Sequence, residues 1–138
     1  MARIAPKIFE FRASIDSDGA LCAEDRNRLD PGETWTPEHL VLAALCRCSL
    51  SSLRHHAEQA GLTASGAASA SGVVTKRERD GRYAFVEIMC GLDVTVEPSP
   101  PEPDELLALA ERDCFVSASL TVKVEYEWRL NGAVVHRS

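Results

Sequence analysis

The stretch TPEHLVLAALCRCSLSSLRHH, residues 36–56, decides the fold of this 138-residue chain. Thr36 and Pro37 are typical of a helix start, because threonine caps free amide groups and proline suits the first helical position. Apolar residues then recur at helical spacing, and Gly61 is typical of a helix end. The sequence therefore predicts a helix over about 37–60, roughly 35 Å long at about 1.5 Å per residue. Its first half is apolar around most of its circumference, so we expect burial on several sides.

The residues before this helix favour short strands. Residues 7–15, KIFEFRASI, alternate between apolar and polar side chains, which is typical of a strand with one buried face. The turn residues DSDG follow, and residues 20–24 can return as a second strand. Residues 26–34 contain Asp-Pro-Gly and are expected to form a loop.

The residues after the helix favour a longer hairpin, a second helix and a final strand. In chain order, the expected elements are a hairpin at 65–96 that turns at Asp80-Gly81, a helix at 104–113, and a strand at 121–130 that turns at Asn131-Gly132. Residues 114–120 fit either a helical turn or a run into the final strand. This order predicts one α+β domain over residues 1–138, with an antiparallel sheet, a long central helix and a second helix. A small sheet covers one side of the long helix, so a homodimer is expected to cover the other.

The composition argues against two classes of partner, nucleic acids and membranes. The formal net charge is −6, and hydrophobic residues make up 45% of the chain. A nucleic-acid partner is not expected, because such binding requires a basic surface. A membrane partner is not expected either, because the chain lacks an apolar run of the roughly 18 residues that a span requires. The N-terminus lacks the apolar segment of a signal peptide, so we expect a cytoplasmic protein.

Five cysteines, an odd number at irregular spacing, do not fit a secreted disulfide framework. Cys46 and Cys48 are two residues apart in the predicted helix, where their side chains would point about 200° away from each other. They are therefore not expected to form a disulfide or to bind one metal ion together. Cys46 shares its side with leucines and is interpreted as a core residue, as are Cys22 and Cys90 in the strand patterns.

Cys114 has a different setting, because it follows the second helix and precedes a possible helical turn. A thiol at a helix start faces unpaired amide groups, which favour the thiolate. A chance position in the core explains Cys114 equally well.

The sequence favours neither a metal site nor a bound cofactor. His55 and His56 are adjacent at the polar end of the long helix, so their rings diverge. HxxxH and CxxC spacings, a GxSxG motif, a glycine-rich phosphate loop and a calcium loop are all lacking in the sequence. No cofactor is therefore expected.

Two motifs resemble the OsmC/Ohr superfamily. TPEHLVLAALCRCSLSSL is similar to the long-helix motif of that family, and AERDCFVSASL is similar to its second cysteine motif. The separation of the two motifs by a hairpin and a helix also fits. The resemblance implies an intertwined α+β homodimer with active sites at the dimer interface, and the reduction of organic hydroperoxides by a thiol peroxidase.

The resemblance also implies roles for three residues. Cys48 would be the thiol that attacks the peroxide, Cys114 would resolve the resulting sulfenic acid as a disulfide, and Glu38 would be the active-site glutamate. An external dithiol would then reduce the disulfide. Glu38 and Cys48 are ten residues apart, or roughly 15 Å along a straight helix. Either the helix is interrupted, or Glu38 acts on Cys48 of the partner chain.

The chain departs from the family pattern at the positively charged residue that would stabilise the Cys48 thiolate. The family supplies an arginine from a glycine-rich turn in its N-terminal hairpin, and no matching turn is present here. Arg12, Arg26 and Arg28 are the candidates to stabilise the thiolate, and Phe115 replaces the proline that usually follows the second cysteine. If no arginine reaches Cys48, activity would be weak or absent.

Two other functions fit the same sequence. The protein could keep the fold and thiols without peroxidase activity and bind a small hydrophobic or electrophilic ligand at the dimer cleft. Alternatively, it could be a structural or interaction protein with five filler cysteines, which predicts that Cys48 and Cys114 lie far apart. The particular hydroperoxide and the particular reductant stay open.

Overall fold

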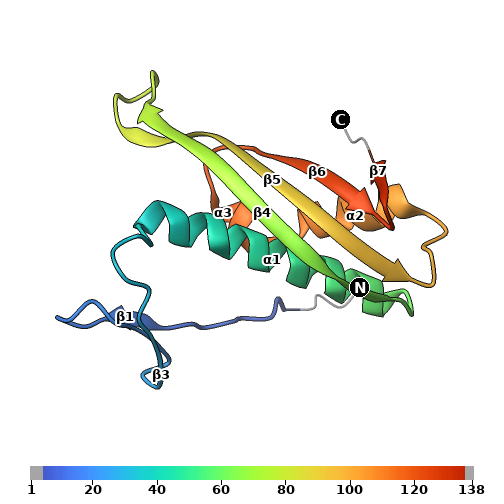
Figure 1. Ribbon diagram of the computed structural model, residues 1–138, viewed down its shortest axis with the longest axis horizontal. Helices are drawn as coiled ribbons and strands as arrows, with labels where there is room; N and C mark the ends of the chain where they lie inside the picture. The colour runs from blue at the N-terminus through green and yellow to red at the C-terminus, as the bar shows by residue number, and fades with distance from the viewer. Residues whose placement is uncertain (1–4, 136–138) are drawn as a thin grey trace. The chain divides into compact units, whose positions relative to one another are not determined.

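The computed structural model describes residues 5–135 (Figure 1). The chain divides into two compact units, Met1–Thr36 and Pro37–Ser138, and each is described by itself. No helix in the described part of the chain is long and apolar enough to cross a membrane.

The smaller unit is a three-stranded antiparallel sheet in the order β1-β2-β3. Its strands are β1 (Ala13–Ile15), β2 (Leu21–Ala23) and β3 (Asn27–Leu29). The first strand is shorter than predicted, because only its last three residues pair with β2. The predicted loop instead contains β3, because Glu24 and Asp25 adopt positive φ angles and reverse the chain tightly. That turn lacks the glycine that would have revealed it in the sequence.

The larger unit contains the long helix and the larger sheet. Its elements are α1 (Pro37–Gln59), β4 (Thr63–Lys76), β5 (Tyr83–Glu97), α2 (Pro103–Arg112), α3 (Phe115–Ser119), β6 (Val124–Leu130) and β7 (Ala133–Val135). The predicted long helix, hairpin and second helix are confirmed, with bounds that differ by a few residues. Residues 115–119 form a helical turn rather than a run into the strand.

The larger sheet has the strand order β4-β5-β6-β7. β4 and β5 form the predicted antiparallel hairpin. β6 lies beside β5 in parallel, because α2 and α3 carry the chain back to the starting end of β5. Asn131 and Gly132, both at positive φ, then turn the chain into the antiparallel strand β7. The α+β class and a mainly antiparallel sheet are confirmed.

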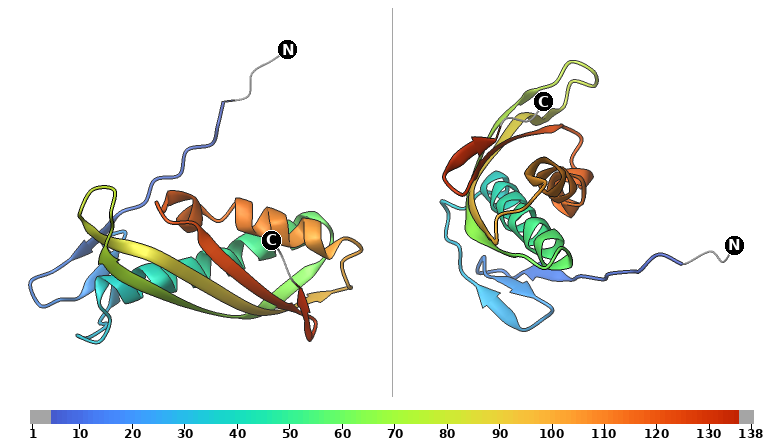
Figure 2. Two further views of the ribbon diagram at one scale, coloured as in Figure 1. Left: turned by 90° about the horizontal axis from the view of Figure 1, so that it is seen from above. Right: turned by 90° about the vertical axis from the view of Figure 1, so that its right-hand side faces the viewer.

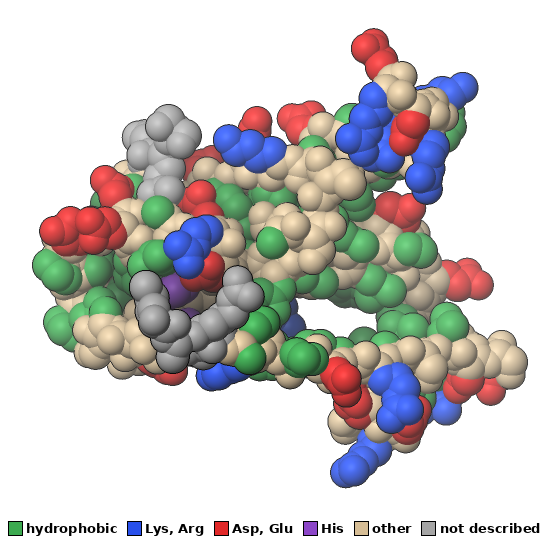
Figure 3. Space-filling view, turned by 180° about the vertical axis from the view of Figure 1, so that it is seen from behind, with side chains coloured by type: hydrophobic (Ala, Val, Ile, Leu, Met, Phe, Trp, Pro, Cys, Tyr) green, Lys and Arg blue, Asp and Glu red, His purple; other side chains and the backbone are tan. Residues whose placement is uncertain are grey.

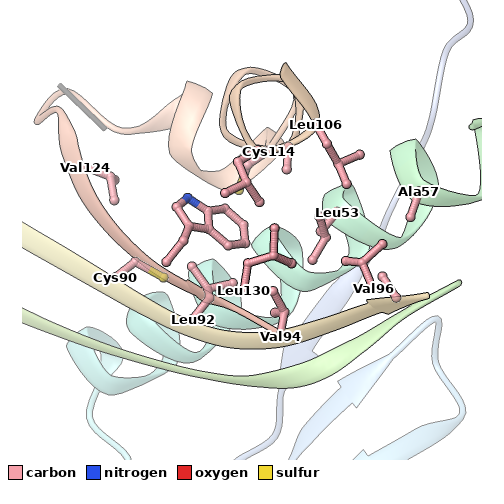
Figure 4. Packing of buried hydrophobic residues seen from close by; sticks show 14 of the residues in the cluster. Leu53, Ala57, Cys90, Leu92, Val94, Val96, Leu106, Cys114, Val124 and Leu130 are labelled. Atoms are coloured by element: carbon pink, nitrogen blue, oxygen red, sulfur yellow. The ribbon is translucent and has the colours of Figure 1, made fainter. Parts of the chain in front are cut away.

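The core lies between the concave face of this sheet and the helices. The sheet curves around α1 and α2 (Figure 2). Leu53 and Ala57 from α1 meet Val94 and Val96 from β5, and all four side chains are almost completely buried (Figure 4). Trp128 is also fully buried, and its Nε1 donates a hydrogen bond of 2.8 Å to Glu111 Oε2. The larger unit therefore holds its own hydrophobic core.

Apolar surface remains on this single chain. Residues 40–43 at the start of α1 are only half-buried, so the expected burial of this half-helix on several sides is not met within one chain. On the sheet, Val73, Tyr83 and Met89 are exposed. Figure 3 shows charged side chains gathered at the tip of the β4–β5 hairpin and hydrophobic patches elsewhere on the same face of the larger unit. The half-buried start of α1 is what a second copy of the chain could cover.

Candidate thiol site

One face of α1 is fastened to the segment that carries Cys114. Ser52 and His56 lie one and two turns after Cys48 on this helix. Ser52 Oγ donates a hydrogen bond of 2.8 Å to the carbonyl oxygen of Ala110 at the end of α2. His56 Nε2 lies 2.7 Å from Oδ2 of Asp113, the residue before Cys114. These two contacts hold the Cys48 face of α1 against the start of α3.

The thiols of Cys48 and Cys114 lie in contact at this junction. Cys114 is the N-cap residue of α3 and is fully buried, whereas Cys48 is half-buried. The Cys114 thiol lies close enough to raise the pKa of the Cys48 thiol. This contact contradicts the alternative of a purely structural protein, which required the two cysteines to lie far apart.

Two hydroxyl groups complete the surroundings of Cys114. Ser49 Oγ lies 3.6 Å from Cys114 Sγ and 3.2 Å from the hydroxyl of Tyr126 on β6. Burial raises the pKa of Tyr126 strongly, so its hydroxyl keeps its proton at neutral pH and can donate it in a hydrogen bond. Ser49 and Tyr126 can therefore stabilise negative charge that forms on the Cys114 sulfur.

Burial raises the pKa of the Cys48 thiol, because the thiolate loses contact with water. The backbone amides of Val116 and Phe115 act in the opposite direction, since they can donate hydrogen bonds to the thiolate. The neighbouring Cys114 raises the pKa of Cys48 further. The balance is a raised pKa, so these surroundings do not by themselves activate Cys48.

Cys46 forms a second thiol contact on another side of α1. Its thiol lies close enough to Cys90 on β5 for each of these two thiols to influence the pKa of the other. Burial raises the pKa of Cys46, and burial together with the neighbouring Cys46 raises the pKa of Cys90 to about 12. Cys90 is a fully buried core residue, as predicted, and Cys46 is half-buried. Cys46 and Cys48 thus face different partners, as helical geometry predicted.

Glu38 lies in the exposed first turn of α1. The helix runs without interruption from Pro37 to Gln59, so about 15 Å of helix separates Glu38 from Cys48 of the same chain. Of the two alternatives, the interrupted helix is therefore wrong. An action of Glu38 on the partner chain stays a prediction.

The three candidate arginines belong to the smaller unit. Arg12 Nη2 lies 3.4 Å from Asp25 Oδ2, and Arg28 pairs with Asp16 at 3.4 Å and with Asp30 at 3.5 Å. Arg26 lies in the exposed turn between β2 and β3. The assignment of one of these arginines to Cys48 stays a prediction.

Sequence reasoning missed Ser49, Tyr126 and the His56–Asp113 pair. A signal for Ser49 was available, because a serine inside an apolar stretch of helix must find a hydrogen-bond partner when it is buried. Its position beside Cys48 then pointed to the thiols. Tyr126 and Asp113 carried no comparable signal, since their partners depend on how α1, α2 and β6 pack.

The described residues, 5–135, contain no group of three or more histidine, cysteine or acidic side chains placed to hold a metal ion. The groups around Cys48 and Cys114 are thiols, hydroxyls and backbone amides. Such groups can perform thiol–disulfide chemistry without a further ligand.

Fold and site together define an α+β protein with a dithiol between a long helix and the start of a short one. Residues 30–128 match the sequence pattern of the family described as OsmC-like protein. The chain belongs to this family. No curated protein matches the sequence significantly.

Several solved structures share the fold. An OsmC-like protein of unknown function from Vibrio cholerae has 16% identity and a TM-score of 0.73, with 88% of this chain and 99% of that chain covered. An OsmC-like protein from Mycoplasma pneumoniae has 19% identity and a TM-score of 0.68, with coverage of 91% and 99%. The organic hydroperoxide resistance protein OhrB of Bacillus subtilis has 21% identity and a TM-score of 0.56, with coverage of 87% and 96%. At these identities the likeness shows the fold.

Proposed function

We propose that this protein is a thiol peroxidase that reduces organic hydroperoxides to alcohols. The observation that carries the proposal is the contact between the thiols of Cys48 and Cys114. Support comes from the family, in which structural neighbours of this chain are named organic hydroperoxide resistance proteins.

The proposed reaction has three steps. The Cys48 thiolate attacks one peroxide oxygen, the O–O bond breaks, and the alcohol leaves while Cys48 becomes a sulfenic acid. The Cys114 sulfur then attacks the Cys48 sulfur, water leaves, and a disulfide forms. An external dithiol reduces this disulfide by two exchange steps. Ser49 and Tyr126 would stabilise the Cys114 thiolate in the second and third steps.

The raised pKa of Cys48 makes a nearby cation necessary for this proposal. We propose that one of Arg12, Arg26 and Arg28 supplies the cation in an intertwined homodimer. Glu38 of the partner chain is proposed to take part in the same site, because it does not reach Cys48 along its own helix. Loss of the arginine that acts should slow the reaction about 10- to 100-fold, the usual effect of one charge-assisted hydrogen bond.

The experiment follows one turnover of reduced protein with t-butyl or cumene hydroperoxide, without external reductant, and maps the oxidised cysteines by mass spectrometry. We expect the wild type to form a Cys48–Cys114 disulfide. Cys48→Ser should be inactive, Cys114→Ser should accumulate a Cys48 sulfenic acid that dimedone traps, and the control Cys22→Ser should behave as wild type. An unoxidised Cys48 in the wild type, or an active Cys48→Ser variant, would contradict the proposal.

The raised pKa of Cys48 favours a second candidate, a protein that binds a small hydrophobic or electrophilic ligand and reduces nothing. The two candidates differ in their response to oxidants and alkylating agents. If hydroperoxide leaves Cys48 reduced in protein that iodoacetamide still alkylates at Cys48, the binding function is favoured. Single Ala variants of the three arginines, all as fast as wild type, would show that another group supplies the cation.

A further inference from the structure

Cys114 is a buried thiol that must recover a proton each time its disulfide is reduced. Its side chain has no exposed surface, whereas Cys48 is half-buried. A reductant in solution therefore reaches the disulfide of the proposed function from the Cys48 side. Attack on the Cys48 sulfur expels Cys114 as a thiolate, and a buried thiolate is costly unless it is protonated or hydrogen-bonded.

Two hydroxyl groups lead away from the Cys114 sulfur. Ser49 Oγ lies 3.6 Å from Cys114 Sγ and 3.2 Å from the hydroxyl of Tyr126, and in each contact either atom can be the donor. Ser49 is almost completely buried, whereas Tyr126 is partly exposed. The ring of Tyr126 stacks on Trp128, with their centroids 6.0 Å apart. A fixed series of polar groups thus runs from the buried sulfur toward the surface.

Tyr126 also lines a cavity of about 510 Å³ in the larger unit. This volume can hold several water molecules, because each occupies about 30 Å³ in the liquid. Polar side chains from α2, α3 and the residues around the start of β6 line the same cavity, among them Glu111, Ser117 and Lys123. The outer end of the hydroxyl series therefore lies where protons can be exchanged with solvent.

We propose that Ser49 and Tyr126 form a proton path, which carries a proton from this cavity to Cys114 when the disulfide is reduced. The proposal rests on the proposed function for the Cys48–Cys114 disulfide. It adds a direction to the reduction, because the reductant attacks Cys48 and Cys114 is the leaving sulfur. Ser49 contacts a reacting sulfur and is a catalytic residue, whereas Tyr126 acts through Ser49 and is a positioning residue.

The reduction balances in two exchange steps. A thiolate of the external dithiol attacks the Cys48 sulfur, the Cys48–Cys114 bond breaks, and its electron pair stays on Cys114. Cys114 takes the proton of Ser49, Ser49 takes that of Tyr126, and Tyr126 takes one from water in the cavity. The second thiolate of the dithiol then attacks its own sulfur in the mixed disulfide, and Cys48 leaves as a thiolate. Burial raises the pKa of Tyr126, so its hydroxyl holds a proton to pass on.

The test starts from a disulfide formed with diamide, so it does not depend on the peroxidase step. The reductant is tris(2-carboxyethyl)phosphine at pH 9, because the unprotonated phosphine has no proton of its own to lose. We expect wild type to react more slowly in heavy water, since a proton moves as Cys114 leaves. Ser49→Ala and Tyr126→Phe should be about 10- to 100-fold slower, the usual effect of one charge-assisted hydrogen bond, and should lose the isotope effect.

Tyr83→Phe and Ser71→Ala are the matched controls, because both positions are exposed on the sheet. They should keep the wild-type rate and isotope effect. A purely structural role of Ser49 and Tyr126 would lower the rate of the variants and leave the isotope effect in place. The direction of attack is measured with 2-mercaptoethanol, whose mixed disulfide should map to Cys48 by mass spectrometry after an acid quench.

The outcomes separate this proposal from the peroxidase. An isotope effect that is missing in wild type or retained in either variant, or a mixed disulfide on Cys114, would overturn the proton path and leave the peroxidase standing. If hydroperoxide leaves Cys48 reduced while the diamide-formed disulfide behaves as expected, the peroxidase proposal fails and the proton path is supported. A protein in which diamide does not join Cys48 to Cys114 would overturn the proton path.

Discussion

At the scale of single residues, the buried polar side chains need both close packing and a hydrogen-bond partner. Ser49 is almost completely buried, and its hydroxyl lies 3.6 Å from the Cys114 sulfur and 3.2 Å from the Tyr126 hydroxyl. Trp128 in the hydrophobic core is also both buried and hydrogen-bonded. Its ring is fully buried, and its Nε1 donates a hydrogen bond to Glu111. Each of these side chains combines close packing with hydrogen bonding, so a change to a purely apolar residue should lower the stability of the fold.

Trp128→Phe should show this cost. The change removes the Nε1 donor and part of the ring, and we expect the free energy of unfolding to fall by about 1–3 kcal/mol. Trp128→Ala should cost more, about 3–5 kcal/mol, because it also leaves a cavity. Urea denaturation followed by circular dichroism measures both changes.

Glu111→Gln is the matched control for the hydrogen bond, since glutamine keeps an oxygen that can accept it. We expect it to cost less than Glu111→Ala. Equal stability of Trp128→Phe and wild type would show that the Nε1 hydrogen bond contributes nothing measurable.

The sequence indicated the candidate cysteines better than it indicated the residues that surround them. Helical geometry separated Cys46 from Cys48 correctly, and the setting of Cys114 before a helical turn was correct. The contact of Cys48 with Cys114 followed only from the family resemblance. Ser49 and Tyr126 could not be paired from the sequence, because their contact depends on how α1 and the sheet that contains β6 pack together.

At the scale of elements, sequence signals were strongest where a helix or hairpin carried its own start and stop residues. α1 and the β4–β5 hairpin were predicted because Pro37, Gly61 and Asp80-Gly81 mark their ends. β3 was missed, because its turn uses Glu24 and Asp25 at positive φ instead of glycine. The parallel pairing of β6 was not predicted either, since pairing partners depend on the path of the whole chain.

The contact between α1 and the end of α2 should depend on pH through Asp113. Arg112, and then His56, hold the pKa of Asp113 below its ordinary range. A folded-state pKa below the unfolded one stabilises the protein above the ordinary aspartate pKa of about 4. This stabilisation is lost as the pH falls through the lower folded-state pKa. Asp113→Asn should therefore be less stable than wild type at pH 7 and should lose less stability on acidification.

Urea denaturation at pH 7, 5 and 3 measures this difference. Asp93→Asn, at an exposed position on β5, is the control and should show the wild-type pH dependence. If Asp113→Asn and wild type lose stability in parallel down to pH 3, the contacts of Asp113 with Arg112 and His56 do not stabilise the fold.

At the scale of the whole molecule, the half-buried start of α1 predicts a homodimer in solution. The chain has a mass of 15.0 kDa, so light scattering should give a mass of about 30 kDa. Ala44 is exposed within this apolar half-helix, and Ala44→Glu would place a charge in the expected interface. We expect the variant to run as a monomer with an unchanged helix signal in circular dichroism.

Arg54→Glu is the matched control, because it changes a charge at an exposed position in the polar half of the same helix. It should remain a dimer. A wild-type protein that runs at 15 kDa across the concentrations used for activity would contradict both the dimer and the shared active site.

The parallel pairing of β6 with β5 has a consequence for synthesis. A ribosome makes the chain from the N-terminus, so α1 and the β4–β5 hairpin emerge while Cys114 is still to come. Cys114 is synthesised 66 residues after Cys48 (114 − 48). The strand β6 is made later still, and it must pair with β5 before Tyr126 reaches the site. The thiol site is thus among the last parts to be assembled, and a chain that stops before Cys114 carries Cys48 without its partner.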